Sequence, residues 1–174
     1  MRRFMMNFSD LATKRYSCRK LTDTPIPAEQ VEVLLAAATA APTAKNNQPY
    51  RIWVMQSEAA RAQIHEVTKC TFGAGLFFVV GGKPSDAWTK EDGFNFAQVD
   101  ATIVATHLML AVADAGLGTT WVGNFDAPKL KALCPEMADY ELVAIFPVGV
   151  PAAGAAPASR HSERKAREAV VKTL

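Results

Sequence analysis

Cysteine is scarce in this sequence. The 174 residues contain three, Cys18, Cys70 and Cys134, and no two of them form a Cys-x-x-Cys pair. A disulfide framework or a cysteine-based zinc site needs more cysteines at closer spacing. We therefore expect a chain that folds without disulfides and binds no metal, in a reducing compartment, the cytoplasm.

A long apolar segment is also lacking. The N-terminal MRRFMMNF carries two arginines but no apolar region after them, unlike a secretory signal. The most apolar run, about residues 101–113, includes two threonines and a histidine and is shorter than the roughly 20 residues of a membrane span. With 49% hydrophobic and 21% charged residues, the composition predicts a single globular domain over residues 1–174 that does not enter a membrane.

A strong net charge is absent, and the formal value of +2 argues against nucleic acid as a partner. The charge is unevenly spread, however. Residues 1–20 hold six basic groups and one acid, residues 160–174 hold five and two, and the residues between hold eight and fourteen. The two ends are either solvated basic tails or two parts of one anion site, such as a phosphate site.

Familiar catalytic motifs are missing as well. The sequence has no Gly-x-Ser-x-Gly, no His-Glu-x-x-His and no P-loop. His65, His107 and His161 lie far apart, and His107 falls inside an apolar helical segment, where we interpret it as a core or interface residue. Hydrolase and metal chemistry therefore have little support, whereas a redox enzyme needs no such motif because its cofactor carries the chemistry.

Apolar periodicity and turn residues predict alternating helices and strands. We expect helices over about 8–14, 27–41, 57–69, 96–115 and 126–133, and strands over 51–55, 76–81, 119–122 and 142–150. Ser9, Ser57 and Asp126 are the predicted N-caps, and Gly116 ends the longest helix. That helix is apolar almost all round, so we expect a second subunit to cover it. The order indicates an α/β or α+β domain, with loops over 42–50 and 83–95.

The first segment with chemical character is Arg15-Tyr16-Ser17-Cys18-Arg19. In an extended stretch, side chains two positions apart project the same way. Arg15, Ser17 and Arg19 then share a face with two cations and a hydroxyl, which suits a phosphate. The plain alternative is a basic surface turn.

Two further segments add to this pattern. Residues 42–50, PTAKNNQPY, offer amide donors and acceptors of the kind that a heteroaromatic ring with carbonyls and ring nitrogens needs, although they also suit a self-contained polar loop. Residues 116–126 include Gly123, which lets a backbone N–H approach a ligand closely. Trp121 and Phe125, taken individually, fit core positions better.

In their order and spacing, these segments resemble the nitroreductase family of FMN-dependent NAD(P)H oxidoreductases, as a short single-domain member. The resemblance extends over nearly the whole chain, to the strand ending FPVGVP and the basic tail. It implies an α+β fold, a three-layer α/β/α sandwich with a mainly antiparallel central sheet, in an intertwined homodimer. Two FMN sites at the subunit interface and a C-terminal arm, about 151–174, packed on the partner are also implied.

The same resemblance implies the site residues. Arg15, Ser17 and Arg19 bind the phosphate and ribityl end, and Arg19 is placed near N1 and O2 of the flavin. Tyr16, between them, is also assigned to the cofactor. The C-terminal cation at the phosphate is Arg160, with Arg164 or Lys165 as alternatives. The second subunit contributes Pro42, Thr43, Ala44, Asn46 and Gln48. Along the ring lie Val122, Gly123 and Asn124, and the N–H of Gly123 is the catalytic donor to N5. The preceding Trp121 is also assigned to the cofactor.

The implied activity is a ping-pong transfer of hydride from NAD(P)H, through tightly and non-covalently bound FMN, to a nitroaromatic, quinone or enone. Specialised flavin-degrading, dehalogenating or peptide-modifying enzymes, a non-catalytic FMN-binding protein and a cofactor-free dimer remain alternatives. The sequence departs from the family at Tyr16, at Ala44 in place of a frequent serine, and over residues 82–95, which are short and match little. The acceptor, a lid and the choice between NADH and NADPH therefore stay open.

Overall fold

The computed structural model describes residues 7–174, so Arg2 and Arg3 of the N-terminal basic cluster lie outside the described residues. Its centre is a sheet in the order β1-β2-β4-β3, and each neighbouring pair is antiparallel. The strands are β1 (Tyr50–Met55), β2 (Leu76–Gly82), β3 (Gly118–Thr119) and β4 (Glu141–Gly149). Every residue of β2 is buried, because the strand is covered on both faces, which explains its continuous apolar run.

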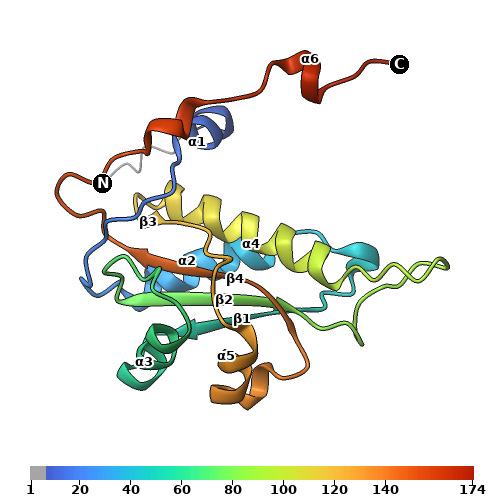
Figure 1. Ribbon diagram of the computed structural model, residues 1–174, viewed down its shortest axis with the longest axis horizontal. Coiled ribbons are helices and arrows are strands. Elements are labelled where there is room, and N and C mark those ends of the chain that lie inside the picture. Colours follow the sequence, from blue (N-terminus) through green and yellow to red (C-terminus); the bar gives the residue numbers. More distant parts are fainter. Residues whose placement is uncertain (1–6) are drawn as a thin grey trace.

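Helices cover both faces of this sheet (Figure 1). On one face lie α2 (Ala28–Thr39) and α4 (Ala97–Asp114), and on the other α3 (Glu58–Val67) and α5 (Ala127–Leu133). The adjacent Phe77 and Phe78 of β2 belong to two different core clusters, one with Ile64 and Leu130, the other with Leu34 and Leu108. The predicted three-layer α/β/α sandwich with an antiparallel sheet is thus confirmed. None of the helices in residues 7–174 is long and apolar enough to cross a membrane.

Local sequence signals set most helix ends. The side chains of Ser57 and Asp126 accept hydrogen bonds from backbone amides three residues ahead, as predicted. Gly116 follows α4 with a φ of +74°, the conformation of a terminating glycine. The cap of α1 (Phe8–Lys14) was predicted wrongly as Ser9: Asn7 immediately precedes the helix, and its side chain accepts from the Asp10 amide at 2.9 Å.

Other boundaries differ modestly from expectation. Pro27 is the N-cap of α2 and not part of its first turn, and the helix ends at Thr39. The strand predicted over 119–122 is interrupted, because the chain leaves the sheet after Thr119 and returns only at Val122, which forms an isolated bridge with Ile145. Short 3-10 turns occur at η1 (Ala44–Asn46), η2 (Pro135–Met137) and η3 (Ser159–Ser162).

The C-terminal arm runs out from the body of the molecule (Figure 1). Beyond η3 it is helical only at α6 (Arg167–Val170), so the helix-competent stretch SERKAREAVV does not form one continuous helix. Val170, Val171 and Leu174 are more than half exposed. The arm therefore presents apolar side chains that its own domain does not cover.

Candidate functional site

The segment after α1 is extended and lies beside the short edge strand β3. The Cys18 amide donates to the Thr119 carbonyl at 2.9 Å, and Ser17 and Thr119 form a parallel bridge. Arg15, Ser17 and Arg19 line a cavity of about 500 Å³, which we call the basic cavity. This is the shared face that the alternation of an extended chain predicts.

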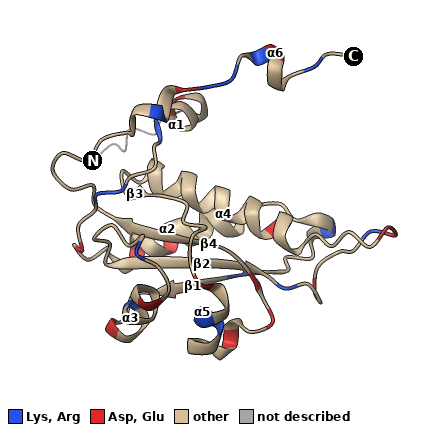
Figure 2. Cartoon of the chain, viewed as in Figure 1, with Lys and Arg blue, Asp and Glu red and all other residues tan. Residues whose placement is uncertain are grey.

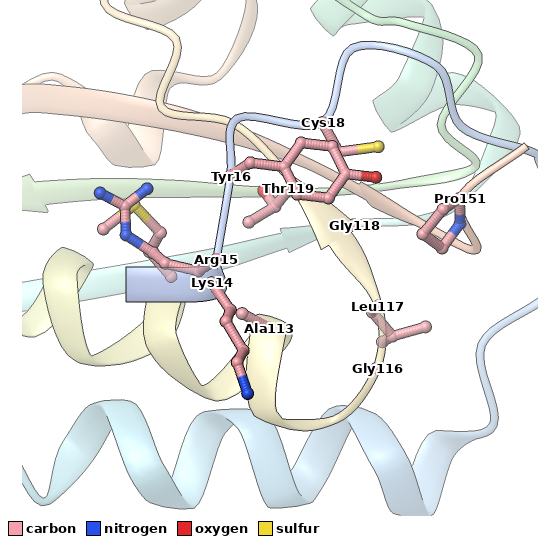
Figure 3. Close-up of a pocket in the computed structure, with 11 residues that line it drawn as sticks. Lys14, Arg15, Tyr16, Cys18, Ala113, Gly116, Leu117, Gly118, Thr119 and Pro151 are labelled. Carbon is pink, nitrogen blue, oxygen red and sulfur yellow. The ribbon is translucent and has the colours of Figure 1, made fainter. Parts of the chain in front are cut away.

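Tyr16 and Cys18 line a different cavity, of about 200 Å³, next to the C-terminal end of α4, and Arg15 lines both cavities (Figure 3). Burial raises the pKa of Tyr16 above its ordinary value, and a hydrogen bond with Cys18 raises it further. The phenol therefore stays protonated and uncharged near neutral pH. Tyr16 is not among the residues that line the basic cavity, although its neighbours Arg15 and Ser17 are.

The C-terminal arm completes the basic cavity. Arg160, His161 and Arg164 line it together with the N-terminal residues, so the two basic ends of the chain meet (Figure 2). No acidic side chain lines this cavity in the described part of the chain, and Lys165 does not line it. Four guanidinium groups and a serine hydroxyl form a donor set that fits a phosphate.

Three of these guanidinium groups are only lightly engaged, whereas Nη1 of Arg164 donates to the carbonyls of His161 and Glu163 at 2.6 and 2.7 Å. Arg160 pairs with Glu163 at 3.0 Å, but both side chains are largely exposed, so the pair contributes little. Arg19 makes a long hydrogen bond of 3.4 Å to the Ser17 carbonyl. Neither Arg15 nor Arg19 forms an ion pair within residues 7–174. Both remain available to an anion.

Residues 121–124 follow β3 after Thr120. The side chains of Trp121 and Val122 point into the protein, whereas Gly123 and Asn124 lie at the surface. Trp121 packs edge-on against Phe146, with ring centroids 5.2 Å apart, and Val122 is 4% exposed. Gly123 and Asn124 are exposed. A Cβ atom at Gly123 would meet nothing within 4 Å, so the packing of the chain does not itself require glycine there.

The loop of residues 42–48 has an unusual backbone. Lys45, Asn46 and Gln48 have φ values of 52°, 55° and 51°, in the left-handed region that residues other than glycine seldom adopt. The Gln48 amide donates to the Thr43 hydroxyl at 3.0 Å, and the Ala44 amide donates to Oδ1 of Asp100 at 2.9 Å. Such strained loops are common where a chain meets a ligand.

One chain does not bring this loop to the basic cavity. The loop is tied to Asp100 in the first turn of α4, whereas the residues from Gly116 onward lead away from the other end of that helix. At 1.5 Å per residue, these two ends are roughly 24 Å apart. The five loop residues that the sequence assigned to the flavin therefore lie far from Arg15, Ser17 and Arg19 within a subunit: Pro42, Thr43, Ala44, Asn46 and Gln48.

Sequence reasoning overlooked two residues. His161 lines the basic cavity beside the candidate Arg160, and its position in the basic tail was the available signal. Asp100 is buried, and the signal was an acid in the first turn of an otherwise apolar helix. His107, interpreted as a core or interface residue, is partly buried with Nδ1 3.4 Å from the Ala37 carbonyl.

Comparisons with known proteins agree with this architecture. The sequence model described as the Nitroreductase family matches residues 12–74 and 69–150. Iodotyrosine deiodinase of Thermotoga neapolitana is 25% identical, over 82% of this chain and 87% of its own length. An Archaeoglobus fulgidus protein provisionally named NADH dehydrogenase/NAD(P)H nitroreductase is 27% identical, over 77% of this chain and 78% of its own.

Solved structures give the same result. A nitroreductase family protein of Clostridium difficile 630 superposes with a TM-score of 0.89 at 31% identity, over 97% of this chain and 100% of that one. A provisionally named nitroreductase of Exiguobacterium sibiricum 255-15, in complex with FMN, shares the fold with a TM-score of 0.83 at 18% identity, over 97% and 98% of the two chains. Because the family match spans most of the sequence, the chain belongs to the nitroreductase family.

Proposed function

We propose that this protein is an FMN-dependent oxidoreductase that acts as a homodimer and uses NAD(P)H to reduce a small nitroaromatic, quinone or enone. The observation that carries the proposal is the basic cavity, where Arg15, Arg19, Arg160 and Arg164 converge from both ends of the chain. When bound, FMN would supply the chemistry, because its N5 can accept hydride from NAD(P)H in one half-reaction and pass it to the acceptor in the other.

The basic cavity fits the phosphate end of FMN. Arg15, Ser17 and Arg160 are assigned to the phosphate, because guanidinium groups and a hydroxyl give charge-assisted, multidentate hydrogen bonds to its oxygens. Arg164 lines the same cavity and serves as a further cation, which makes it the better of the two alternatives to Arg160. Arg19 is assigned to N1 and O2, where a positive group stabilises negative charge on the ring.

Residues 121–124 fit one edge of the ring. Val122 exchanges two backbone hydrogen bonds of 3.0 Å with Ile145, and the Asn124 carbonyl accepts from Thr68 at 2.8 Å. These bonds fix the segment on both sides of Gly123, whose exposed N–H is assigned as the donor to N5. The role of this chain is position and electrostatics, with no dedicated acid or base.

The loop of residues 42–48 is assigned to the flavin of the partner subunit, because the length of α4 separates it from the basic cavity of its own chain. Unpartnered apolar surface supports a dimer. A groove of about 330 Å³ between α1, α2 and α4 contains Phe8, which is 72% exposed, and Val33, which is 47% exposed. The exposed valines and leucine of the C-terminal arm would gain cover on the partner in the same way.

The first test is an anaerobic absorption experiment on the purified protein with FMN. We expect the spectrum of a bound flavin, bleaching by NADH or NADPH, and recovery when a nitroaromatic or quinone is added. A protein that does not bind FMN would contradict the whole proposal. A protein that binds FMN, but whose flavin neither nucleotide reduces, would instead be a non-catalytic FMN-binding protein.

A second candidate, reductive dehalogenation, has one specific observation in its favour, the similarity to iodotyrosine deiodinase. It is tested with the same reduced protein, by comparing the rate of flavin reoxidation with an iodophenol and with a nitroaromatic of similar size. We expect the nitroaromatic to react faster. A faster reaction with release of iodide would favour the dehalogenase.

Subunit complementation tests the assignment of the loop to the partner. Arg15→Ala damages the basic cavity, and the double variant Thr43→Ala, Gln48→Ala damages the loop. After unfolding and refolding an equal mixture, we expect roughly a quarter of the normal number of FMN sites, because half of the dimers are mixed and each of these has one intact site. If cavity and loop of one chain formed a site together, no site would recover. Each variant refolded alone is the control.

A further inference from the structure

A buried carboxylate fixes the loop of residues 43–48 to the body of the protein. Asp100 is 1% exposed and lies in the first turn of α4, near the positive end of the helix dipole. Its Oδ1 accepts a 2.9 Å hydrogen bond from the Ala44 amide, which is 56 positions away in the sequence. A charged acceptor makes this bond stronger than one between neutral groups.

The other hydrogen bonds of the loop do not anchor it equally well. Those from the Asn46 and Gln48 amides end on Thr43, within the loop itself. The side-chain amide of Asn47 donates to the Asp86 carbonyl at 3.3 Å, but this bond is exposed and Asp86 itself lies in a surface loop. A loop with three non-glycine residues in the left-handed region persists only when its surroundings hold it there. Among the described residues, Asp100 is the buried side chain that forms a hydrogen bond with this loop.

We infer that Asp100 is a positioning residue, whose carboxylate holds Ala44 so that the loop of residues 43–48 presents its amide groups to the flavin of the partner subunit. The flavin part of this inference rests on the proposed function. Asp100 is too buried to touch FMN or the acceptor, so it acts through the loop. Its second oxygen, Oδ2, is buried and has no hydrogen-bond partner within residues 7–174. An asparagine would keep the acceptor for Ala44 but would bury an amide N–H without an acceptor at the Oδ2 position.

The chain offers variants that separate positioning from stability. For Asp100→Ala we expect the dissociation constant of FMN to rise at least about tenfold, and hydrogen exchange at the Ala44 amide to accelerate by a similar factor, since one hydrogen bond to a charged acceptor is lost. For Asp100→Asn we expect a change in FMN affinity of no more than about threefold, because the side-chain oxygen still accepts from Ala44. The melting temperature should fall, because the negative charge at the positive end of α4 is lost.

Val104→Ala is the matched structural control. Val104 lies one turn further along α4, is fully buried, and belongs to the apolar cluster of Leu108 and Phe78. Its truncation leaves a cavity in the core and lowers the melting temperature. We expect neither the affinity for FMN nor exchange at Ala44 to change. A loss of affinity in Val104→Ala equal to that in Asp100→Ala would overturn the inference, as would normal FMN binding by Asp100→Ala.

The exchange measurement also distinguishes this inference from the proposed function. If the unaltered protein does not bind FMN, the proposed function is wrong, and exchange at the Ala44 amide decides the anchoring alone. Faster exchange in Asp100→Ala than in the unaltered protein supports the anchor. Equal exchange in the two proteins shows that Asp100 does not hold the loop.

Discussion

Replacing Arg15 by alanine is expected to weaken FMN binding by roughly a hundredfold, the effect of losing a charge-assisted, bidentate contact to phosphate. Arg15 is the residue of the extended segment that starts the shared face, and it lines the basic cavity without an ion pair to any described residue. No acidic side chain of residues 7–174 therefore competes with the phosphate for this guanidinium group. Titration of the apoprotein with FMN, followed by quenching of flavin fluorescence, measures the change.

Lys14→Ala is the control for net charge. It removes the same charge at the neighbouring position, but Lys14 is largely exposed and its ammonium pairs with Asp10 at 3.3 Å, one helical turn back. Lys14 lines the smaller cavity beside Tyr16 and not the basic cavity. We expect FMN affinity to change by less than about twofold, because an exposed charge outside the site is screened by solvent and salt.

Riboflavin, which lacks the phosphate, sharpens this experiment. If Arg15 acts on the phosphate, the unaltered protein and Arg15→Ala should bind riboflavin with similar affinity. If Arg15→Ala loses affinity for FMN and riboflavin equally, Arg15 contacts the ring or supports the fold and does not act on the phosphate. An equal loss of FMN affinity in Lys14→Ala and Arg15→Ala would show that Arg15 acts only through the general attraction of positive charge for an anion, and not through a specific contact.

The parts of the site that the sequence predicts are those governed by local periodicity. Alternation along an extended chain is sufficient to place Arg15, Ser17 and Arg19 on one face, and the structure has them there. Continuous apolar runs likewise mark β2 and β4, because strands covered on both faces have no polar side. The basic ends were different: their composition allowed two free tails as well as one anion site, and only the path of the arm brings Arg160 to Arg15.

Contacts between distant segments escaped prediction. The hydrogen bond between Ala44 and Asp100 depends on how α2 and α4 stack, and no short sequence window contains both residues. The left-handed conformations of Lys45, Asn46 and Gln48 could not be predicted, because none of these residues is glycine, the residue that usually marks a positive φ. The distance between this loop and the basic cavity is set by the length of α4, so the sequence suggested a two-chain site only through family resemblance.

The largest effect on folding is expected for Gly82→Ala. Gly82 ends β2 where the first residue of α4 crosses it, and a Cβ there would collide with the Ala97 carbonyl oxygen. Backbone cannot move aside as a flexible side chain does, so either the strand or the start of α4 must shift. We expect a loss of about 4 kcal/mol or more in the free energy of unfolding, at the extreme of what a single overpacking substitution costs. Urea denaturation of the apoprotein measures it.

Two other glycines make this prediction specific. Gly116→Ala meets no atom within 4 Å but forces alanine into a φ of +74°, so we expect a loss of about 1 kcal/mol. Gly123→Ala meets neither obstacle, so the unfolding free energy should stay within about 0.5 kcal/mol. Its methyl group would instead point into the space assigned to the flavin, and FMN affinity should fall while stability does not. Alanine keeps the backbone N–H, so this variant tests only how closely the flavin approaches. Normal FMN affinity in Gly123→Ala would show that no ligand comes close to the Cα of Gly123, because no atom of the described residues fills that space.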